Sequence, residues 1–151
     1  MVYIMQDDLI INKIGTINKC IDRIKYEYEE SKELFKKNFT KQDAVILNLE
    51  RASQAAIDIA SHIVRIKKLG IPQTNRDVFV FLENANLISN KTSKKMQAMV
   101  GFRNIAVHDY QTLDLDIIVE ILEKHLNDFV EFINQIIKSN ESVIVKIQRP
   151  K

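Results

Sequence analysis

The stretch 44–72, AVILNLERASQAAIDIASHIVRIKKLGIP, decides the fold, because apolar residues cover most of the circumference of the helix that it would form. A helix of this kind is surrounded by other elements, so we expect it at the centre of the molecule. The preceding TKQD has the pattern of a capping box, with Thr40 as N-cap and Asp43 three positions later. Gly70 and Pro72 are typical of the chain just beyond a helix end, and we expect the helix to stop there.

Four further segments with helical patterns flank this central helix. Apolar residues recur every three or four positions over residues 8–36, which predicts an amphipathic helix. A second capping box, TNRD, opens a short helix that we expect over residues 74–86. The next helix is expected to begin near Asn90 or Thr92, and the last one near Asp114, where the apolar periodicity is clearest.

The scarcity of turn-forming residues supports the same fold class. Only 3 glycines and 2 prolines occur in 151 residues, whereas a β-rich chain needs many turns. The sequence therefore predicts an all-α, up-and-down bundle of four main helices plus one short helix. In the tail ESVIVKIQRPK, β-branched residues dominate, and two structures fit this pattern: a short extended segment, or a frayed continuation of the last helix. We expect a helical domain at residues 1–138 and an irregular or extended tail at residues 139–151.

Composition narrows the classes of function. The net charge of +2 is too small to indicate a nucleic-acid binder from bulk charge, so any basic surface would have to be local. The one cysteine, Cys20, excludes an internal disulfide, and His125 is expected to be a hydrogen-bonded core or interface residue rather than a metal ligand. The chain has no apolar run of about 18 residues and no basic N-terminal region. We expect a soluble cytoplasmic protein without metal, cofactor or membrane partner.

The central helix carries one polar stripe. Its members recur at steps of three or four: Asn48, Arg51, Gln54 (or Ser53), Asp58, His62 and Arg65. Arg51 and Asp58 are candidates to orient a reactive segment on a neighbouring helix, and Asp58 and His62 are spaced to pair with each other. The same stripe is consistent with a face turned toward solvent or toward a second chain.

A reactive segment, MVGFRNIAVHDYQ, occupies residues 99–111. Arg103 and Asn104 suit a helix end, and in that purely structural interpretation the following residues form a loop. In the chemical interpretation, His108 moves protons and Arg103 holds phosphate oxygens, which is what RNA cleavage through the ribose 2′-hydroxyl requires. Arg103 and His108 are about 140° apart on an ideal helix. They converge only if the helix breaks between them or if a second copy of the chain completes the site.

The segment RNIAVHDY, residues 103–110, has the form R-x4-H-x-Y and resembles the signature of HEPN toxins of the HepT type. The similarity extends to ILNLERASQAAIDIASHIVRIKKLGIPQ at residues 46–73, to LIS at residues 87–89 and to the LD that follows the motif. It covers about residues 5–138. The resemblance implies a helical HEPN-like fold and a metal-independent ribonuclease, the toxin of a type II toxin–antitoxin pair.

The same resemblance implies site residues and partners. It assigns catalysis to Arg103 and His108, in a cleft that the two chains of a homodimer form around the RNA substrate. Asn104, Asp109 and Tyr110 have supporting roles. The implied second partner is an MNT-type nucleotidyltransferase antitoxin, which neutralises such toxins and can do so by AMPylation, here of Tyr110.

One alternative function fits the same resemblance. HEPN-like bundles also resemble non-catalytic modules that associate with nucleotidyltransferases and bind nucleotide or partner. In that case Arg103 and His108 shape an interface. The lysines that open the motif helix, Lys91, Lys94 and Lys95, are either a solvated helix start or an extension of a phosphate-binding surface.

Overall fold

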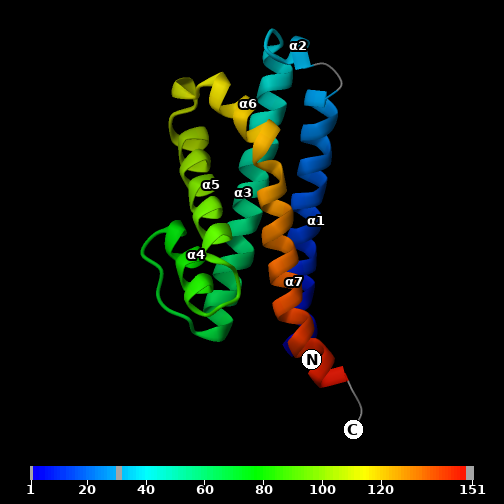
Figure 1. Ribbon diagram of the computed structural model, residues 1–151, viewed down its shortest axis with the longest axis vertical. Helices are drawn as coiled ribbons and strands as arrows, with labels where there is room; N and C mark the ends of the chain where they lie inside the picture. The colour runs from blue at the N-terminus through cyan, green and yellow to red at the C-terminus, as the bar shows by residue number, and fades with distance from the viewer. Residues whose placement is uncertain (1, 30–31, 149–151) are drawn as a thin grey trace.

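The computed structural model describes the backbone of residues 2–29 and 32–148 and the side chains of residues 8–29 and 32–139. All the regular structure in this part of the chain is helical (Figure 1). In chain order the helices are α1 Val2–Glu29, α2 Lys32–Phe35, α3 Phe39–Lys67, α4 Asn75–Asn84, α5 Asn90–His108, the 3₁₀-helix η1 Tyr110–Thr112, α6 Leu115–Lys124 and α7 Leu126–Gln148. The predicted all-α bundle is confirmed. None of the described helices is both long and apolar enough to cross a membrane.

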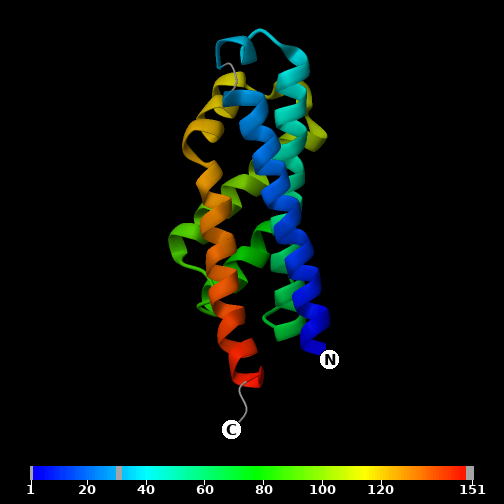
Figure 2. The same cartoon turned by 90° about the vertical axis from the view of Figure 1, so that its right-hand side faces the viewer.

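Helix α3 lies at the centre of the bundle, as its apolar circumference predicts. It packs against α1 on one side and against α4 and α5 on the other (Figure 1). Helix α7 closes the bundle by packing against α1 and α5. Helix α5 ends near the same end of the molecule as α2 and α6, whereas α1 begins and α7 ends at the opposite end (Figures 1 and 2).

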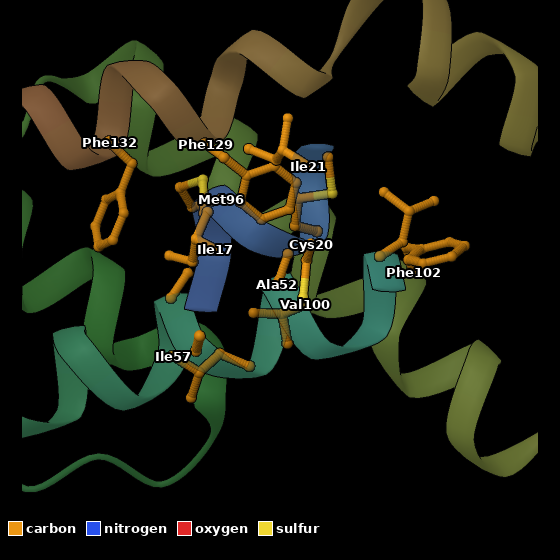
Figure 3. Close-up of a cluster of buried hydrophobic side chains, with 14 of the residues drawn as sticks. Ile17, Cys20, Ile21, Ala52, Ile57, Met96, Val100, Phe102, Phe129 and Phe132 are labelled. Carbon is orange, nitrogen blue, oxygen red and sulfur yellow. The ribbon is translucent and has the colours of Figure 1, made fainter. Parts of the chain in front are cut away.

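The core forms where these four long helices meet. Along α3, Ala52, Ala56 and Ala60 recur every four residues and are fully buried, and small side chains at this spacing let neighbouring helices approach closely. Figure 3 shows part of this core, where Ala52 of α3 lies in one cluster with side chains from three other helices: Ile17, Cys20, Met96, Val100, Phe129 and Phe132. Truncation of a fully buried ring such as Phe129 is expected to cost about 3–5 kcal/mol.

The N-terminus of α3 differs from the prediction. The N-cap is Asn38, whose side-chain oxygen accepts the backbone N–H of Lys41 at 3.1 Å. Thr40 lies within the first turn of the helix, so its predicted role as N-cap is wrong. Asparagine caps helices as well as threonine does, and the sequence offers both within three positions. Asp43 is therefore not part of a capping box.

The C-terminus of α3 also differs from the prediction in its details. Lys68 adopts the left-handed conformation, with φ 54° and ψ 49°, and its N–H is bonded to the last turn. The helix thus ends before Gly70. Glycine is required at position 70 for another reason, because a Cβ there would come within 2.9 Å of the Phe81 ring.

The starts of α4 and α5 follow the sequence closely. The carboxylate of Asp77 accepts the N–H groups of Gln73 and Thr74 at 2.8 and 3.1 Å, as a capping box requires. These hydrogen bonds hold the pKa of Asp77 below its usual value. Helix α5 begins after Ser89, whose hydroxyl accepts the N–H of Thr92 at 3.1 Å. The polar residues that open both helices therefore satisfy their first N–H groups.

The predicted last helix is two helices in the structure. Helix α6 ends at Lys124 and α7 begins at Leu126. Between them, His125 has φ −122° and ψ 0°, although its N–H still donates to the carbonyl of Ile121 at 2.8 Å. The apolar periodicity does not register this break, because it reports which face is buried rather than whether the backbone is continuous.

The tail is helical as far as it is described. Helix α7 continues to Gln148, so the irregular or extended tail expected from residue 139 is wrong for residues 139–148, and the continued last helix is correct. Valine and isoleucine lower helix propensity only slightly, so a helix that is already formed can run through them. The expected boundary between residues 138 and 139 falls inside α7. Residues 149–151 lie outside the described residues.

Candidate active site

The reactive segment forms the last turns of α5 and the short helix after it. Helix α5 is continuous from Asn90 to His108, so Arg103 and Asn104 do not end it. The helix stops at Asp109, whose N–H donates to the carbonyl of Ile105 at 2.8 Å. Because no break separates Arg103 from His108, the two side chains leave the helix about 140° apart. A single chain therefore does not bring them together on one helix face.

The two principal side chains differ in their surroundings. Arg103 is half-buried, and its Nε is buried and has no hydrogen-bond partner among the described residues. Arg103 lies about one turn before Ala106, which lines a pocket between α3 and the end of α5. His108 is exposed at the end of the helix, as are Asn104 and Asp109 nearby. The arrangement leaves an imidazole accessible to a large ligand and holds a guanidinium close to the bundle.

Tyr110 is hydrogen-bonded to α3. Its hydroxyl donates a hydrogen bond to the carboxylate of Asp43, 67 positions earlier in the chain. Partial burial is the largest cause that raises the pKa of Tyr110 to about 12, and the bond to the negatively charged Asp43 raises it further. The phenol of Tyr110 is therefore neutral at physiological pH. Asp43 was not predicted to belong to this site, because its position three residues after Thr40 fits a capping box.

A small pocket lies beside this hydrogen bond, between α3 and the end of α5. Its volume is about 310 Å³, and its lining is Asp43, Ile46, Leu47, Glu50, Ala106 and Tyr110. Two of these residues are acidic, and the rest of the wall is mostly apolar. The tyrosine hydroxyl thus lies at the edge of a cavity that has a carboxylate on the opposite helix.

A larger pocket lies on another side of α5. It has a volume of about 480 Å³ and is mostly apolar, with Met99, Phe102, Ile105, Leu113, Ile117 and Ile121 among its lining residues. Arg103 and His108 do not line it. Ile105 and Ile117 are 45% and 53% exposed, so this pocket opens onto an apolar surface next to the motif.

The polar stripe of α3 does not turn toward the motif as a unit. Asp58 forms an ion pair with Lys13 of α1 at 3.1 Å and accepts a hydrogen bond from Gln54 at 2.8 Å. His62 contacts Arg65 at 3.3 Å, so the predicted pairing of Asp58 with His62 does not occur. Arg51 is exposed. Asp58 thus holds α1 against α3, away from α5.

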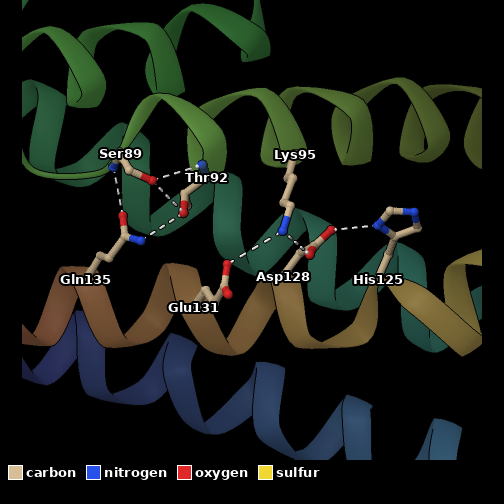
Figure 4. Close-up of polar contacts among 7 residues, drawn as sticks. All are labelled: Ser89, Thr92, Lys95, His125, Asp128, Glu131 and Gln135. Atoms are coloured by element: carbon tan, nitrogen blue, oxygen red, sulfur yellow. Dashed lines mark hydrogen bonds and ion pairs between the residues drawn. The ribbon is translucent and has the colours of Figure 1, made fainter.

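The lysines at the start of α5 divide into two groups. Lys91 and Lys94 are exposed. Lys95 instead pairs with the buried carboxylate of Asp128 at 3.2 Å and with Glu131 at 3.7 Å, across to α7 (Figure 4). Asp128 also accepts a hydrogen bond from Nδ1 of His125 at 2.9 Å, so His125 is hydrogen-bonded as expected. The ammonium group of Lys95 therefore forms ion pairs within the bundle.

These features define a helical bundle with an R-x4-H-x-Y motif at the end of one helix, and comparison with known proteins identifies the family. Residues 17–136 match the ribonuclease HepT-like family. The mRNA nuclease HepT of Shewanella oneidensis is 54% identical over 130 residues, which span 86% of this chain and 97% of that protein. The tRNA nuclease HepT of Aphanizomenon flos-aquae is 26% identical over 128 residues, or 85% and 87% of the two chains.

A solved structure agrees with the sequence comparison. The tri-AMPylated HEPN toxin of Shewanella oneidensis, in complex with its MNT antitoxin, has a TM-score of 0.82 and 54% identity to this chain. The match covers 87% of this chain and 98% of that one. This chain belongs to the HepT-like ribonuclease family.

Proposed function

We propose that this chain is the ribonuclease toxin of a HEPN–MNT toxin–antitoxin pair. The observation that carries the proposal is the complete R-x4-H-x-Y motif at the exposed end of α5, in a chain that is 54% identical to an mRNA nuclease across 97% of that protein. The exposed His108 and the partly free guanidinium of Arg103 are the groups that phosphodiester chemistry requires.

The proposed reaction is an attack by a ribose 2′-hydroxyl on the adjacent phosphate. A histidine takes the proton from the 2′-oxygen, the 2′-oxygen bonds to phosphorus, and the bond to the 5′-oxygen breaks. A second acid returns a proton to the departing 5′-oxygen. Arg103 stabilises the negative charge that builds on the phosphate oxygens, and no step needs a metal ion. Because one chain supplies one His108, a base and an acid of the same kind require two copies.

A homodimer is the assembly that this chemistry favours. Since α5 is continuous, Arg103 and His108 converge only across an interface. Exposed aliphatic side chains surround the motif, with Ile105, Val107 and Ile117 each at least 43% exposed. Such a cluster is typical of a protein-binding surface. We place the second copy on this side, so that Asn104 and Asp109 also lie at the shared cleft.

The proposed second partner is a nucleotidyltransferase antitoxin that transfers AMP to Tyr110. The side chain of Tyr110 is 44% exposed, two residues from His108. One or more adenylates there would add bulk and negative charge where an RNA phosphate must bind, which blocks the nuclease without disturbing the fold.

Purified protein and His108→Ala test the nuclease. We expect the parent chain to degrade RNA in the presence of EDTA and His108→Ala to lose at least about 100-fold in rate, since general acid–base catalysis contributes about 10²–10⁴. His62→Ala, which removes a histidine from α3, is the matched control and should cleave at the parent rate. If His108→Ala cleaves as fast as the parent protein, the assignment is wrong.

A further inference from the structure

The hydrogen bond between Tyr110 and Asp43 joins the proposed modification site to a carboxylate on another helix. We propose that Asp43 accepts the proton of Tyr110 when its hydroxyl attacks the α-phosphate of a nucleoside triphosphate during AMPylation. This inference rests on the proposed function, and it assigns to the toxin itself one of the groups that carry out its own inactivation.

The fold presents this carboxylate in a suitable position. Asp43 lies near the start of α3, and Tyr110 is the first residue of η1, directly beyond α5. The N–H of Leu113 donates to the carbonyl of Tyr110 at 3.1 Å, which closes η1 and fixes the backbone that carries the ring. Among the described residues, the Tyr110 hydroxyl is the one hydrogen-bond or ion-pair partner of Asp43. In the part of the chain whose side chains are described, no lysine, arginine or histidine forms an ion pair with this carboxylate.

The chemistry needs a proton acceptor at this point. The pKa of Tyr110 is raised to about 12, so the hydroxyl arrives at the reaction with its proton. In the proposed step, the tyrosine oxygen bonds to the α-phosphorus, the bond from that phosphorus to the β-phosphate oxygen breaks, and pyrophosphate leaves. The phenolic proton passes to Asp43 as the oxygen–phosphorus bond forms, because the phenol becomes more acidic along that path. Atoms and charge balance without any further reactant.

The pocket beside the hydrogen bond supplies a comparison carboxylate. Tyr110 and Asp43 lie at its edge, and Glu50, one further charged residue in its lining, is on α3 and has no hydrogen bond to Tyr110. Glu50 therefore offers a matched comparison: it is a carboxylate on the same helix and in the same cavity, without the contact to the hydroxyl.

The test measures AMP transfer in the complex of the full chain with its nucleotidyltransferase. Initial rates with saturating ATP are compared for the parent chain, Asp43→Asn and Glu50→Gln between pH 6.5 and pH 9. Asparagine keeps an oxygen that accepts the hydroxyl hydrogen bond but is not a base. We expect Asp43→Asn to lose at least tenfold at pH 7 and to regain up to about tenfold per pH unit until it reaches the parent rate, because hydroxide must then remove the proton.

The parent chain and Glu50→Gln should have similar rates that change less than threefold over the same range. Thermal unfolding of each variant checks that the fold is retained. If Asp43→Asn transfers AMP at the parent rate, or loses rate with the same pH profile as the parent, Asp43 is not the acceptor and the inference is wrong. If the parent chain receives no AMP at all, the proposed pairing with a nucleotidyltransferase fails instead, and this inference fails with it.

Discussion

Two tyrosines in this chain each donate a hydrogen bond to a carboxylate on another helix. The hydroxyl of Tyr28 on α1 donates to Glu123 on α6 at 2.5 Å, and that of Tyr110 donates to Asp43 on α3. Burial and then the carboxylate raise the pKa of each tyrosine to about 12. The Tyr28 pair links α1 to α6, whereas the Tyr110 pair lies beside the reactive motif. The same chemical arrangement thus serves packing in one place and, in our proposal, reactivity in the other.

The two pairs allow an internally controlled titration. Asp43→Asn removes the negative charge beside Tyr110, so its pKa should fall from about 12 toward the ordinary value of 10, while Tyr28 remains at about 12. NMR of protein labelled at the tyrosine Cζ carbon follows each ring separately up to pH 10.5. An unchanged Tyr110 titration in Asp43→Asn would contradict the hydrogen bond.

The same raised pKa sets the sign of a stability effect. Tyr110 has a higher pKa in the folded chain than in the unfolded one, so its contribution to stability is complete below pH 10 and is lost as the pH rises toward about 12. In Asp43→Asn this loss should be smaller.

For single residues, the sequence predicts which side chains share a local motif, but it does not predict contacts between residues far apart in the chain. Arg103 and His108 are found from their five-residue separation, since a motif within one helix is visible in the chain. Asp43 is not, because 67 positions separate it from Tyr110 and its side chain also fits a capping pattern. The true N-cap, Asn38, leaves Asp43 available for Tyr110.

At the scale of elements, a row of polar contacts joins α5 to α7 (Figure 4). At one end, the amide of Gln135 accepts the N–H of Ser89 and donates to the hydroxyl of Thr92, both at 2.8 Å. At the other end, Asp128 contacts Lys95 and His125. Hydrogen bonds and ion pairs therefore hold the first half of α5 against α7. Because α5 is one continuous helix, these contacts also fix the orientation of its second half, which carries the motif.

Removal of the central carboxylate should weaken this junction. Asp128 is 4% exposed and bonds both to Lys95 and to His125. Asp128→Ala should lower the free energy of unfolding by about 1–3 kcal/mol, because buried partners lose a charged hydrogen bond. Urea denaturation measures it. Glu120→Ala, which removes an exposed ion pair with Lys124, is the control and should leave the stability unchanged within error. If both variants have the same free energy of unfolding, this row of polar contacts does not contribute measurably to stability.

Helix boundaries were predictable where a side chain marks them. The Asp77 box and the Ser89 start were marked by polar residues that bond to the first turn. The break at His125 and the continuation of α7 through residues 139–148 were not, because apolar periodicity runs across the first and β-branched residues are compatible with either structure in the second.

At the scale of the whole molecule, the proposed site depends on an assembly that one chain does not contain. Arg103 and His108 are fixed on different sides of one uninterrupted helix. These side chains can converge by a break in the helix between them or by the addition of a second chain, and the continuous helix removes the first possibility. The dimer interface cannot be predicted from a local sequence pattern, because an interface depends on surfaces assembled from several helices.

Mixing the parent chain with an inactive variant tests the shared cleft. If the base and the acid are the two His108 side chains of one dimer, a dimer that contains one His108→Ala chain is inactive. After unfolding and refolding together, an equal mixture of the parent chain and His108→Ala should show about a quarter of the activity of the same total amount of parent chain, since about a quarter of the dimers then contain two intact chains. RNA cleavage is the readout. About half of the activity would instead mean that each chain carries a complete site.

The direction of the helices has a practical consequence for anyone who handles this chain. The start of α1 and the end of α7 lie together at the pole of the bundle opposite the end of α5 (Figures 1 and 2). An affinity tag or fluorescent fusion at either extremity would extend away from the motif, whereas an insertion in the α5–α6 connection would land on it. Labels for imaging or purification therefore belong at the extremities.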